Sequence, residues 1–412
     1  GAIMNYVIIG NSTAAVGCIE QIRKTDQKGK ITVISDEPYH TYGRPLISYY
    51  LLGRVDAAHM NYRPADFYEE NAVKTLLGVR AERIDPAAKK VFLHGGKSVP
   101  YDKLLVATGS RPFVPPMEGY DTVKEKFTFM TFADALALEQ ALSPEKDVLI
   151  VGAGLTGLKC MEGILARVKS VTVVDLADRL MPSALDEYGA GIIQRQLEGM
   201  GVQFYLKNAV ARFEGNTAHL KGGETLPFDI LVVAAGVRPN VELIKDAGGE
   251  VARGIVTDDH QKTSLPDVYA AGDCTESYDI TSGTRKILAL LPNAYFQGAC
   301  AGANMAGAEE AFDMAVPLNA VGFFGSHVLT AGTFDGEPYE EKGTNTYKKL
   351  FFKDGVLNGF ILVNEPERAG IYTSLVRNKT PLAEVDAELL KRHPALMAFS
   401  AAVRQQKLAK KV

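Results

Sequence analysis

The chain has 412 residues, a formal net charge of −4, and 46% hydrophobic and 23% charged residues. Its length is too great for a single hydrophobic core, so two or three domains are expected, with the composition of an ordinary globular protein. The mild negative charge gives no reason to expect nucleic acid as a partner, since that use requires a concentrated basic surface.

No apolar stretch approaches the ~20 residues that cross a bilayer, and the start of the chain shows no signal-peptide pattern. The four cysteines, Cys18, Cys160, Cys274 and Cys300, form no C-x-x-C pair. Sparse, isolated thiols fit a reducing compartment and argue against a disulfide framework or a metal site. The sequence therefore predicts a cytoplasmic protein without a membrane segment.

The first predicted element is a strand, a tight turn and the start of a helix, YVIIGNSTAAVG (6–17). Gly10 ends the apolar run, but Ser12 and Ala15 occupy the places of the second and third glycines of G-x-G-x-x-G. Both are small, so the backbone can still approach a pyrophosphate at the helix amino terminus. A plain strand and helix without a ligand is the alternative.

The next strand, Ile31 to Ser35, is followed at once by Asp36 and Glu37. An acidic side chain at this point can accept hydrogen bonds from the ribose diol of a dinucleotide. The acid therefore favours a dinucleotide site at the first turn.

A second nucleotide turn is intact. VLIVGAGLTGLKCMEGI carries Gly152, Gly154 and Gly157 in G-x-G-x-x-G spacing, directly after an apolar strand. The strand VTVVD (171–175) follows and ends in Asp175, 23 residues after Gly152. A carboxylate suits a free 2′-hydroxyl and repels a 2′-phosphate, so this turn predicts NADH rather than NADPH.

In three later stretches an apolar strand ends in small residues. They are LLVATGSRP (104–112), LVVAAGVRPN (231–240) and PDVYAAGDCTE (266–276). With these motifs in this order, the chain from Met4 to about Ala311 resembles the two-dinucleotide-binding flavoprotein reductases of the pyridine nucleotide–disulfide oxidoreductase superfamily. The resemblance implies FAD at the first turn and NAD(H) at the second.

The resemblance also implies the fold class and the domain order. The expected fold is α/β, with two Rossmann-like dinucleotide-binding domains, for FAD and NAD, plus a C-terminal α+β interface domain. The expected domains are 1–115 (FAD-binding, first part), 116–239 (NAD-binding), 240–315 (FAD-binding, second part) and 316–412 (C-terminal). The last often forms a dimer interface in the family, so a homodimer is an expectation.

Cofactor contacts follow from the same likeness. Asp273 would bind the ribityl-phosphate region of FAD, and the helix NAYFQGACAGANMAG (293–307) would face the isoalloxazine. The residues implied in cofactor binding are Gly10, Ser12, Ala14, Ala15, Asp36, Glu37, Arg44, Pro45, Ser48, Ala107, Thr108, Gly109, Arg111, Gly152, Gly154, Leu155, Thr156, Gly157, Asp175, Gly236, Gly272, Asp273 and Gln297.

The segment PYHTYGRPLISYYLLG (38–53) has no cysteine, although the disulfide-reducing branches place their reactive thiol there. Without that nucleophile, dithiol reduction has no relay. RPLIS, from Arg44 to Ser48, resembles instead the R-P-x-L-S signature of the thiol-less ferredoxin, rubredoxin and nitrite-reductase-type NADH reductases. A simple turn and helix start is the alternative interpretation.

In the oxygenase-coupled relatives, a lysine after this signature lies near flavin N5. It pairs with a glutamate two residues after the last glycine of the NAD fingerprint. Here those positions are Tyr49 and Lys159, our candidate catalytic residues. Because both partners differ together, neither charge is left alone. Lys159 could contact the flavin, the nicotinamide amide or a neighbouring carboxylate, or lie in solvent.

Shorter alternating runs begin near residue 316. YKKLFFKDGVLNGFILVN predicts two strands around the turn Lys353–Gly355, and helices are expected from Ala369 and over Glu384–Arg392. In FFGSHVLTAG (323–332), His327 could face the flavin cavity as a proton donor or be structural. The tail 398–412 is expected to be a partner-binding helix or a frayed end.

The sequence therefore predicts an FAD-dependent oxidoreductase that oxidises NADH by hydride transfer to flavin N5. It would pass the electrons to an iron–sulfur carrier of the rubredoxin or ferredoxin type. Catalysis is expected mainly from the positioning of the nicotinamide against the isoalloxazine. Two alternatives stay open: reduction of a small acceptor such as a quinone, a sulfur species or oxygen, and a redox-sensing flavoprotein. No bound metal ion is expected.

Overall fold

Strands far apart in the sequence share the first sheet of the computed structural model, which describes residues 1–365 and 369–394. The sheet is parallel, in the order β18-β7-β1-β2-β3. Its strands are Asn5–Ile9 (β1), Lys30–Ser35 (β2), Val73–Leu77 (β3), Lys103–Val106 (β7) and Val268–Ala270 (β18). Runs such as NYVII form central strands because both faces of a parallel sheet are covered. The expected strand 31–35 is confirmed.

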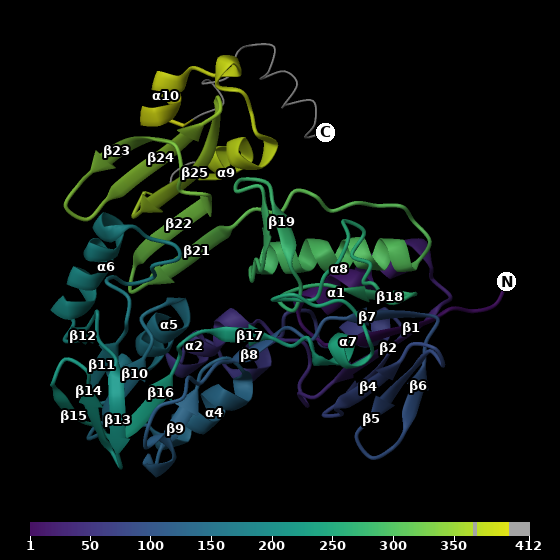
Figure 1. Cartoon of the computed structure of the whole chain (residues 1–412), viewed down its shortest axis with the longest axis horizontal. Helices are drawn as coiled ribbons and strands as arrows, with labels where there is room; N and C mark the ends of the chain where they lie inside the picture. Colours follow the sequence, from purple (N-terminus) through teal and green to yellow (C-terminus); the bar gives the residue numbers. More distant parts are fainter. Residues whose placement is uncertain (366–368, 395–412) are drawn as a thin grey trace.

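Two long helices, Thr13–Thr25 (α1) and Leu291–Met305 (α8), pack against each other beside this sheet (Figure 1). Glycines make the close approach possible. A Cβ atom on Gly17 would lie 2.5 Å from the Tyr295 carbonyl oxygen, and one on Gly298 would lie 2.0 Å from that of Ala14. The start of α1, which follows the first glycine turn, is therefore held by α8.

The second sheet is also parallel, in the order β12-β11-β10-β16-β9. Its strands are Lys126–Thr128 (β9), Asp147–Val151 (β10), Ser170–Val174 (β11), Gln203–Tyr205 (β12) and Ile230–Val233 (β16). Its main helices are Phe132–Ala141 (α4), Leu155–Ile164 (α5) and Glu187–Gly199 (α6). The two parallel sheets confirm the predicted α/β class with two Rossmann-like units.

Smaller antiparallel sheets and short helices complete the nucleotide units. One sheet comprises Ala81–Asp85 (β4), Lys90–Leu93 (β5) and Ser98–Pro100 (β6), and another Val210–Glu214 (β13), Thr217–Leu220 (β14) and Thr225–Pro227 (β15). A hairpin comprises Ser277–Asp279 (β19) and Thr284–Lys286 (β20). The short helices are Ile47–Leu51 (α2), Phe67–Glu70 (α3) and Glu242–Asp246 (α7).

The chain crosses between the two parallel sheets through a paired ribbon. Its strands, Ser110–Pro112 (β8) and Val237–Pro239 (β17), run antiparallel, with Val237 opposite Pro112. The Thr108 hydroxyl donates to the Asn240 carbonyl at 2.8 Å, and the Asn240 side-chain amide donates back to the Thr108 carbonyl at 2.8 Å. Both crossings are therefore held together as one connection.

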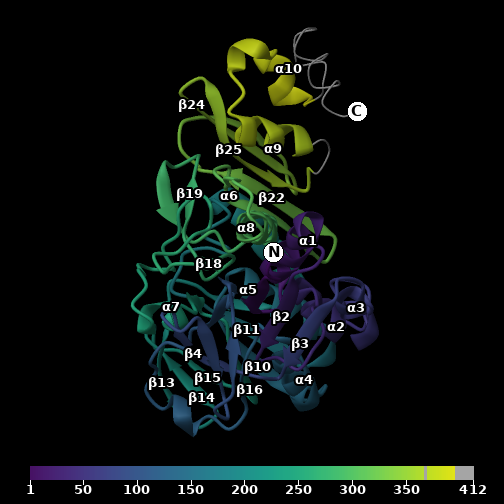
Figure 2. The same cartoon turned by 90° about the vertical axis from the view of Figure 1, so that its right-hand side faces the viewer.

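The last sheet is antiparallel, in the order β21-β22-β25-β24-β23, and lies with its helices at one end of the molecule (Figures 1 and 2). Its strands are Leu318–Phe323 (β21), Ser326–Gly332 (β22), Glu337–Lys342 (β23), Tyr347–Lys353 (β24) and Val356–Val363 (β25). The predicted strand pair around Lys353–Gly355 is confirmed.

The helix expected from Ala369 is also confirmed, as Ala369–Asn378 (α9). The helix expected over Glu384–Arg392 is wrong at its start, because it covers Ala387–Arg392 (α10). The Asp386 side chain accepts a hydrogen bond from the Leu389 amide at 3.1 Å and so caps the helix there. The tail 398–412 lies outside the described residues. Among the described helices, none is both long and apolar enough to span a bilayer.

Candidate cofactor-binding active site

The first glycine turn keeps the geometry that a pyrophosphate needs. Gly10 has φ +122°, and a Cβ atom there would lie 2.0 Å from the Ala107 carbonyl oxygen. Ser12 precedes α1 without a side-chain capping bond, and the first turn of α1 has no acidic residue. Ala15 is fully buried, so its small size is set by packing. The helix end therefore presents free N–H groups to an anion.

At the end of β2, the two predicted acids differ in their surroundings. Asp36 is exposed, whereas Glu37 is half-buried. Glu37 accepts a hydrogen bond from the Tyr42 hydroxyl at 2.6 Å and one from the Arg44 guanidinium at 3.1 Å. Glu37 is thus the carboxylate that the fold orients, a distinction that two adjacent acids in a sequence do not reveal.

The loop after β2 contains buried polar atoms that lack a hydrogen-bond partner and are available to a ligand. His40 Nε2, Thr41 Oγ1 and Arg44 Nε have no hydrogen-bond partner among the described residues. Buried polar atoms without partners are uncommon in folded proteins, because each costs free energy. This loop lies next to the first turn, since the Asn11 side-chain amide donates to the Tyr39 carbonyl at 3.2 Å. The residues therefore fit a polar group such as FAD.

The Gly272-Asp273 turn supports the same fit. Gly272 has φ +87°, and its N–H donates to Gln297 Oε1 at 2.7 Å. The Gln297 amide nitrogen donates to Ser277, so this side chain holds the turn from α8. Burial raises the pKa of Asp273, and the positive charge of Arg44 opposes that rise.

The three glycines of the second turn differ in what surrounds them. A Cβ atom on Gly152 would lie 2.1 Å from the Ala234 carbonyl oxygen, and one on Gly157 would lie 2.0 Å from that of Gly152. Gly154 has no described atom within 4 Å of such a Cβ, so the chain itself does not require glycine there. Leu155 and Thr156, which open α5, are exposed. Space for a close backbone–ligand approach is therefore kept at Gly154.

Asp175 follows β11 and is fixed by backbone amides. Its Oδ2 accepts from the Ala153 N–H at 2.6 Å, and its Oδ1 accepts from the Ala177 N–H at 2.8 Å. The next residue, Leu176, is 72% exposed and brings no positive charge. The arrangement suits a neutral ribose diol better than a 2′-phosphate.

Other predicted residues are engaged within the protein. Arg111 Nη1 lies 2.9 Å from Glu242 Oε1 and donates to Asn240 Oδ1 at 2.8 Å, so it fastens the ribbon. Gly109 and Gly236 have φ +63° and +109° at its ends. The Ser48 hydroxyl donates to the Pro45 carbonyl at 3.3 Å and closes the RPLIS turn.

The two candidate catalytic residues come together. Lys159 Nζ lies 4.6 Å from the centroid of the Tyr49 ring, and it also pairs with the buried carboxylate of Glu162. Glu162 was missed by sequence reasoning, although its i+3 spacing from Lys159 on a helix is a usable signal. His327 is exposed on β22 rather than enclosed.

All four cysteines are free and buried, on α1, on α5, beside Asp273 and on α8. Burial raises the pKa of the Cys274 thiol to about 11 and that of Cys300 to about 12. None lies on α2, where a thiol relay would be required. The predicted inert character of these thiols agrees with their burial.

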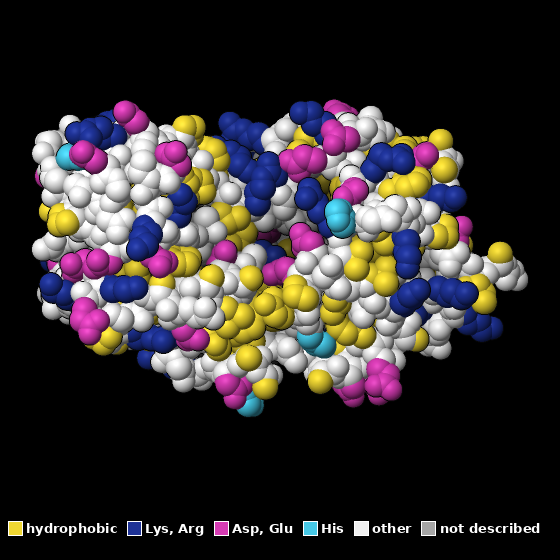
Figure 3. All heavy atoms as spheres, turned by 90° about the horizontal axis from the view of Figure 1, so that it is seen from below, with side chains coloured by type: hydrophobic (Ala, Val, Ile, Leu, Met, Phe, Trp, Pro, Cys, Tyr) yellow, Lys and Arg dark blue, Asp and Glu magenta, His cyan; other side chains and the backbone are white. Residues whose placement is uncertain are grey.

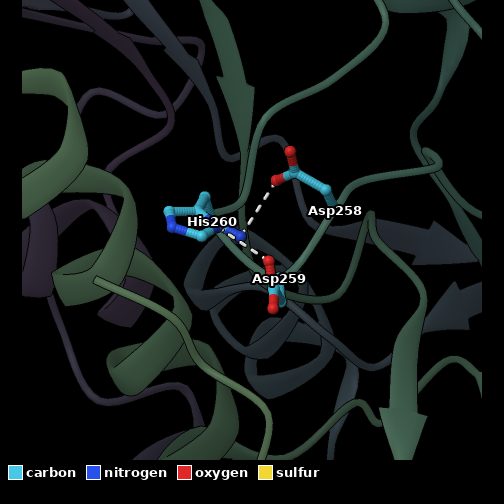
Figure 4. Close-up of side chains that lie close together, drawn as sticks. All are labelled: Asp258, Asp259 and His260. Carbon is cyan, nitrogen blue, oxygen red and sulfur yellow. Dashed lines mark hydrogen bonds and ion pairs between the residues drawn. The ribbon is translucent and has the colours of Figure 1, made fainter. Parts of the chain in front are cut away.

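An acidic cluster at Asp258, Asp259 and His260 forms a surface turn (Figure 4). Asp258 Oδ1 accepts from the N–H groups of His260 and Lys262, each at 2.9 Å. Asp259 Oδ1 lies 2.7 Å from His260 Nδ1. These bonds explain the grouping without an ion.

Seen from below, the molecule is hollowed between the half that carries the second sheet and the half that carries the first (Figure 3).

Residues 4–298 match the family described as pyridine nucleotide-disulphide oxidoreductase. The chain belongs to this family. Members bind FAD and NAD(H), and the chain is an oxidoreductase that uses both cofactors.

Individual relatives cover most of the chain. It is 33% identical over 390 residues to the epsilon subunit of NADH-dependent phenylglyoxylate dehydrogenase from Aromatoleum evansii, covering 92% of each chain. It is 29% identical to rubredoxin-NAD(+) reductase of Pseudomonas putida, covering 74% of this chain and 80% of that protein. It spans about half the length of several nitrate and nitrite reductase components that it also matches.

The fold is that of a solved reductase. The crystal structure of the covalent putidaredoxin reductase–putidaredoxin complex superposes with a TM-score of 0.87 at 22% identity. The match covers 100% of this chain and 99% of that one. The likeness in fold therefore extends from the two parallel sheets to the C-terminal antiparallel sheet.

Proposed function

We propose that the chain oxidises NADH by hydride transfer to bound FAD and passes the electrons to an iron–sulfur carrier of the rubredoxin or ferredoxin type. FAD, when bound, supplies the chemistry that joins a two-electron donor to one-electron acceptors. The chain's own residues bind the two cofactors, orient them and keep their reactive rings apart from bulk water.

One observation carries this proposal: the two dinucleotide turns belong to units whose helices α2 and α5 are in contact, and α2 has no cysteine. A Cβ atom on Gly163 of α5 would lie 3.1 Å from the Ser48 carbonyl oxygen of α2. This contact would bring cofactors held at the two turns close to each other, and α2 has no thiol to receive electrons. Electrons must leave to an external acceptor.

We propose site roles in three groups. Tyr49 and Lys159 flank the place where the two cofactors meet. The first turn, the RPLIS segment and the Gly-Asp turn bind FAD through Gly10, Ser12, Ala14, Ala15, Glu37, Arg44, Pro45, Ser48, Ala107, Thr108, Gly109, Gly272, Asp273 and Gln297. The second turn binds NADH through Gly152, Gly154, Leu155, Thr156, Gly157, Asp175 and Gly236.

An iron–sulfur acceptor is supported by the likeness to rubredoxin-NAD(+) reductase. The same likeness leaves the individual carrier open, because surface features, not the fold, select a partner. A small acceptor is the second candidate, because the absence of a thiol on α2 is equally compatible with an oxygen or quinone reductase.

The test starts with the purified protein, whose flavin spectrum is expected to bleach on anaerobic mixing with NADH. Rubredoxin, ferredoxin and a quinone are then compared as acceptors at equal concentration. Fast reduction of an iron–sulfur protein supports the proposal, and fast reduction of the quinone alone overturns its acceptor. Slow turnover with every acceptor, with an NADH-dependent change of mass in light scattering, would indicate a redox sensor instead.

We also propose a cytoplasmic location. The four free, buried thiols support a reducing compartment. Fractionation of the native host, followed by detection of the protein in the soluble cytoplasmic extract, tests this placement.

A further inference from the structure

A buried ion pair lies where three parts of the chain meet. Lys159 is on α5, with its side chain 15% exposed, and its Nζ lies 2.5 Å from Oε1 of Glu162 on the same helix. Glu162 is 3% exposed. The ammonium also donates to the Gly322 carbonyl of β21 at 3.0 Å. Two of its three donors are therefore used.

Aromatic rings from two other parts of the chain cover the same ammonium. Its Nζ lies 4.6 Å from the ring centroid of Tyr49 on α2 and 5.3 Å from that of Phe323 on β21. Both distances are within the range of a cation–π contact. The charge therefore sits among groups from the first unit, the second unit and the last sheet.

The other oxygen of Glu162, Oε2, binds the tip of the β21–β22 hairpin. It accepts from the Phe324 N–H at 2.9 Å. Phe324 and Gly325 form a two-residue loop with φ +45° and +86°, and a non-glycine residue at such φ is strained unless its surroundings hold it. Gln196 of α6 donates to the Phe324 carbonyl at 3.2 Å. The hairpin tip is thus clamped by two helices of the second unit.

The pair lies where α5, which follows the second glycine turn, meets α2 and β21. Lys159 is two residues beyond Gly157, and Tyr49 follows Ser48 on the helix that touches α5. An unpaired charge at this depth would be costly, so each member needs the other. Together they would place a fixed cation and its counter-charge close to dinucleotides bound at the two turns.

We propose that Glu162 is a positioning residue: it fixes the Lys159 ammonium between Tyr49 and Phe323 and balances its charge beside the flavin. This inference rests on the proposed function. Reduction of a flavin adds negative charge to it, so a nearby positive charge raises its midpoint potential and a nearby negative charge lowers it. The intact pair holds these opposite influences in balance.

The experiment measures the midpoint potential of the flavin in the holoprotein by equilibrium titration against a reference dye. Glu162→Gln leaves the ammonium uncompensated and is expected to raise the potential. Lys159→Met leaves the carboxylate uncompensated and is expected to lower it. The double variant, in which neither charge remains, is expected to return close to the parent value.

Gln196→Leu is the matched control, because it loosens the same hairpin tip without changing any charge. It is expected to leave the potential unchanged. Shifts of the same sign in both single variants, no shift in either, or an equal shift in Gln196→Leu would overturn the inference.

A second measurement guards against single variants that do not fold. The double variant leaves no unpaired charge, and loss of the fixed ammonium is expected to raise the KM for NADH about tenfold, as the loss of one charge-assisted contact would, with little change in kcat. An unchanged KM in the double variant would count against positioning. A parent protein that holds no FAD, or is not reduced by NADH, refutes the proposed function instead.

Discussion

Asp273 is a half-buried carboxylate that the protein alone does little to stabilise. Burial raises its pKa, and the charge of Arg44 offsets this only in part. A group whose pKa is raised on folding favours the folded state at low pH, and this contribution is lost as the pH rises through the folded pKa. In the flavin-free protein, the ionised Asp273 therefore costs stability at neutral pH.

We expect Asp273→Asn to raise the thermal midpoint of the flavin-free protein at pH 7 and to weaken FAD binding in the same variant. The gain in stability should shrink as the pH is lowered toward the ordinary aspartate pKa of 3.8. Thermal melts over that pH range and flavin titration measure the two effects.

Asp279 provides the opposite case as a control. Burial raises its pKa, but hydrogen bonds from Thr281 and Lys286 outweigh burial and leave the pKa lowered. Asp279→Asn should therefore destabilise the protein at pH 7, and the loss should fade toward low pH. Equal responses of the two variants would contradict a cofactor role for Asp273.

Nicotinamide preference is the second prediction at this scale. Asp175→Asn removes the negative charge that we propose faces the ribose, and it replaces one acceptor with a donor beside the Ala153 and Ala177 amides. A charge-assisted hydrogen bond contributes about 1.5–3 kcal/mol, so kcat/KM for NADH is expected to fall roughly 10- to 100-fold. The kcat/KM for NADPH should fall less than that for NADH. Steady-state kinetics with both nucleotides measure the ratio, and a parallel loss would mean that Asp175 only supports the turn.

Some of these residues were within reach of the sequence, and others were not. Asp175 follows a strand at the spacing of a ribose-binding acid, which is a local pattern. The orientation of Glu37 depends on hydrogen bonds from Tyr42 and Arg44. Gln297 accepts a hydrogen bond from the N–H of Gly272, which lies 25 residues away in the sequence. Side-chain partners brought by tertiary packing leave no periodic signal.

Among the elements, the crossing of α1 and α8 leaves no room for an added methyl group. Gly298→Ala would place a Cβ atom 2.0 Å from the Ala14 carbonyl oxygen. Overpacking of this kind costs about 1–3 kcal/mol or more. We expect a lower free energy of unfolding and weaker FAD retention, because the start of α1 must move.

Gly199→Ala is the control for that change. Gly199 also lies in a helix, α6, but no atom of the described residues is within 4 Å of a Cβ built there. Alanine should stabilise the protein by up to about 1 kcal/mol, since glycine is the more flexible residue in the unfolded chain. Urea unfolding of both variants measures the difference, and equal effects would refute the packing explanation.

The elements themselves were largely predictable. Apolar runs followed by small residues located β1, β7, β10, β16 and β18, whereas β3, β9 and β12 were not predicted. The alternating runs around Lys353–Gly355 located a hairpin. The start of α10 was misplaced because Glu384 looks like a helix residue, whereas the capping side chain of Asp386 sets the boundary. The glycines of the α1–α8 crossing signal close approach only once both helices are seen together.

For the molecule as a whole, the buried thiols predict how the protein responds to thiol reagents. The thiolate is the reactive form, and burial raises the pKa of all four cysteines. We expect none of them to react with a disulfide reagent at the rate of an exposed cysteine until the protein is unfolded. A variant without cysteines should still show flavin reduction by NADH, and loss of that reaction with FAD retained would reveal a hidden thiol step.

The β8–β17 ribbon determines how one unit of the protein can be separated from the other. Pro112 and Val237 are paired across the ribbon, so the two ends of the segment between them lie side by side. A tight two-residue turn grafted across that gap would convert the ribbon into an ordinary hairpin. The segment 113–236, which holds the second parallel sheet, is thus inserted at one side of the unit of the first sheet, and it could be exchanged without changing the path of any other strand.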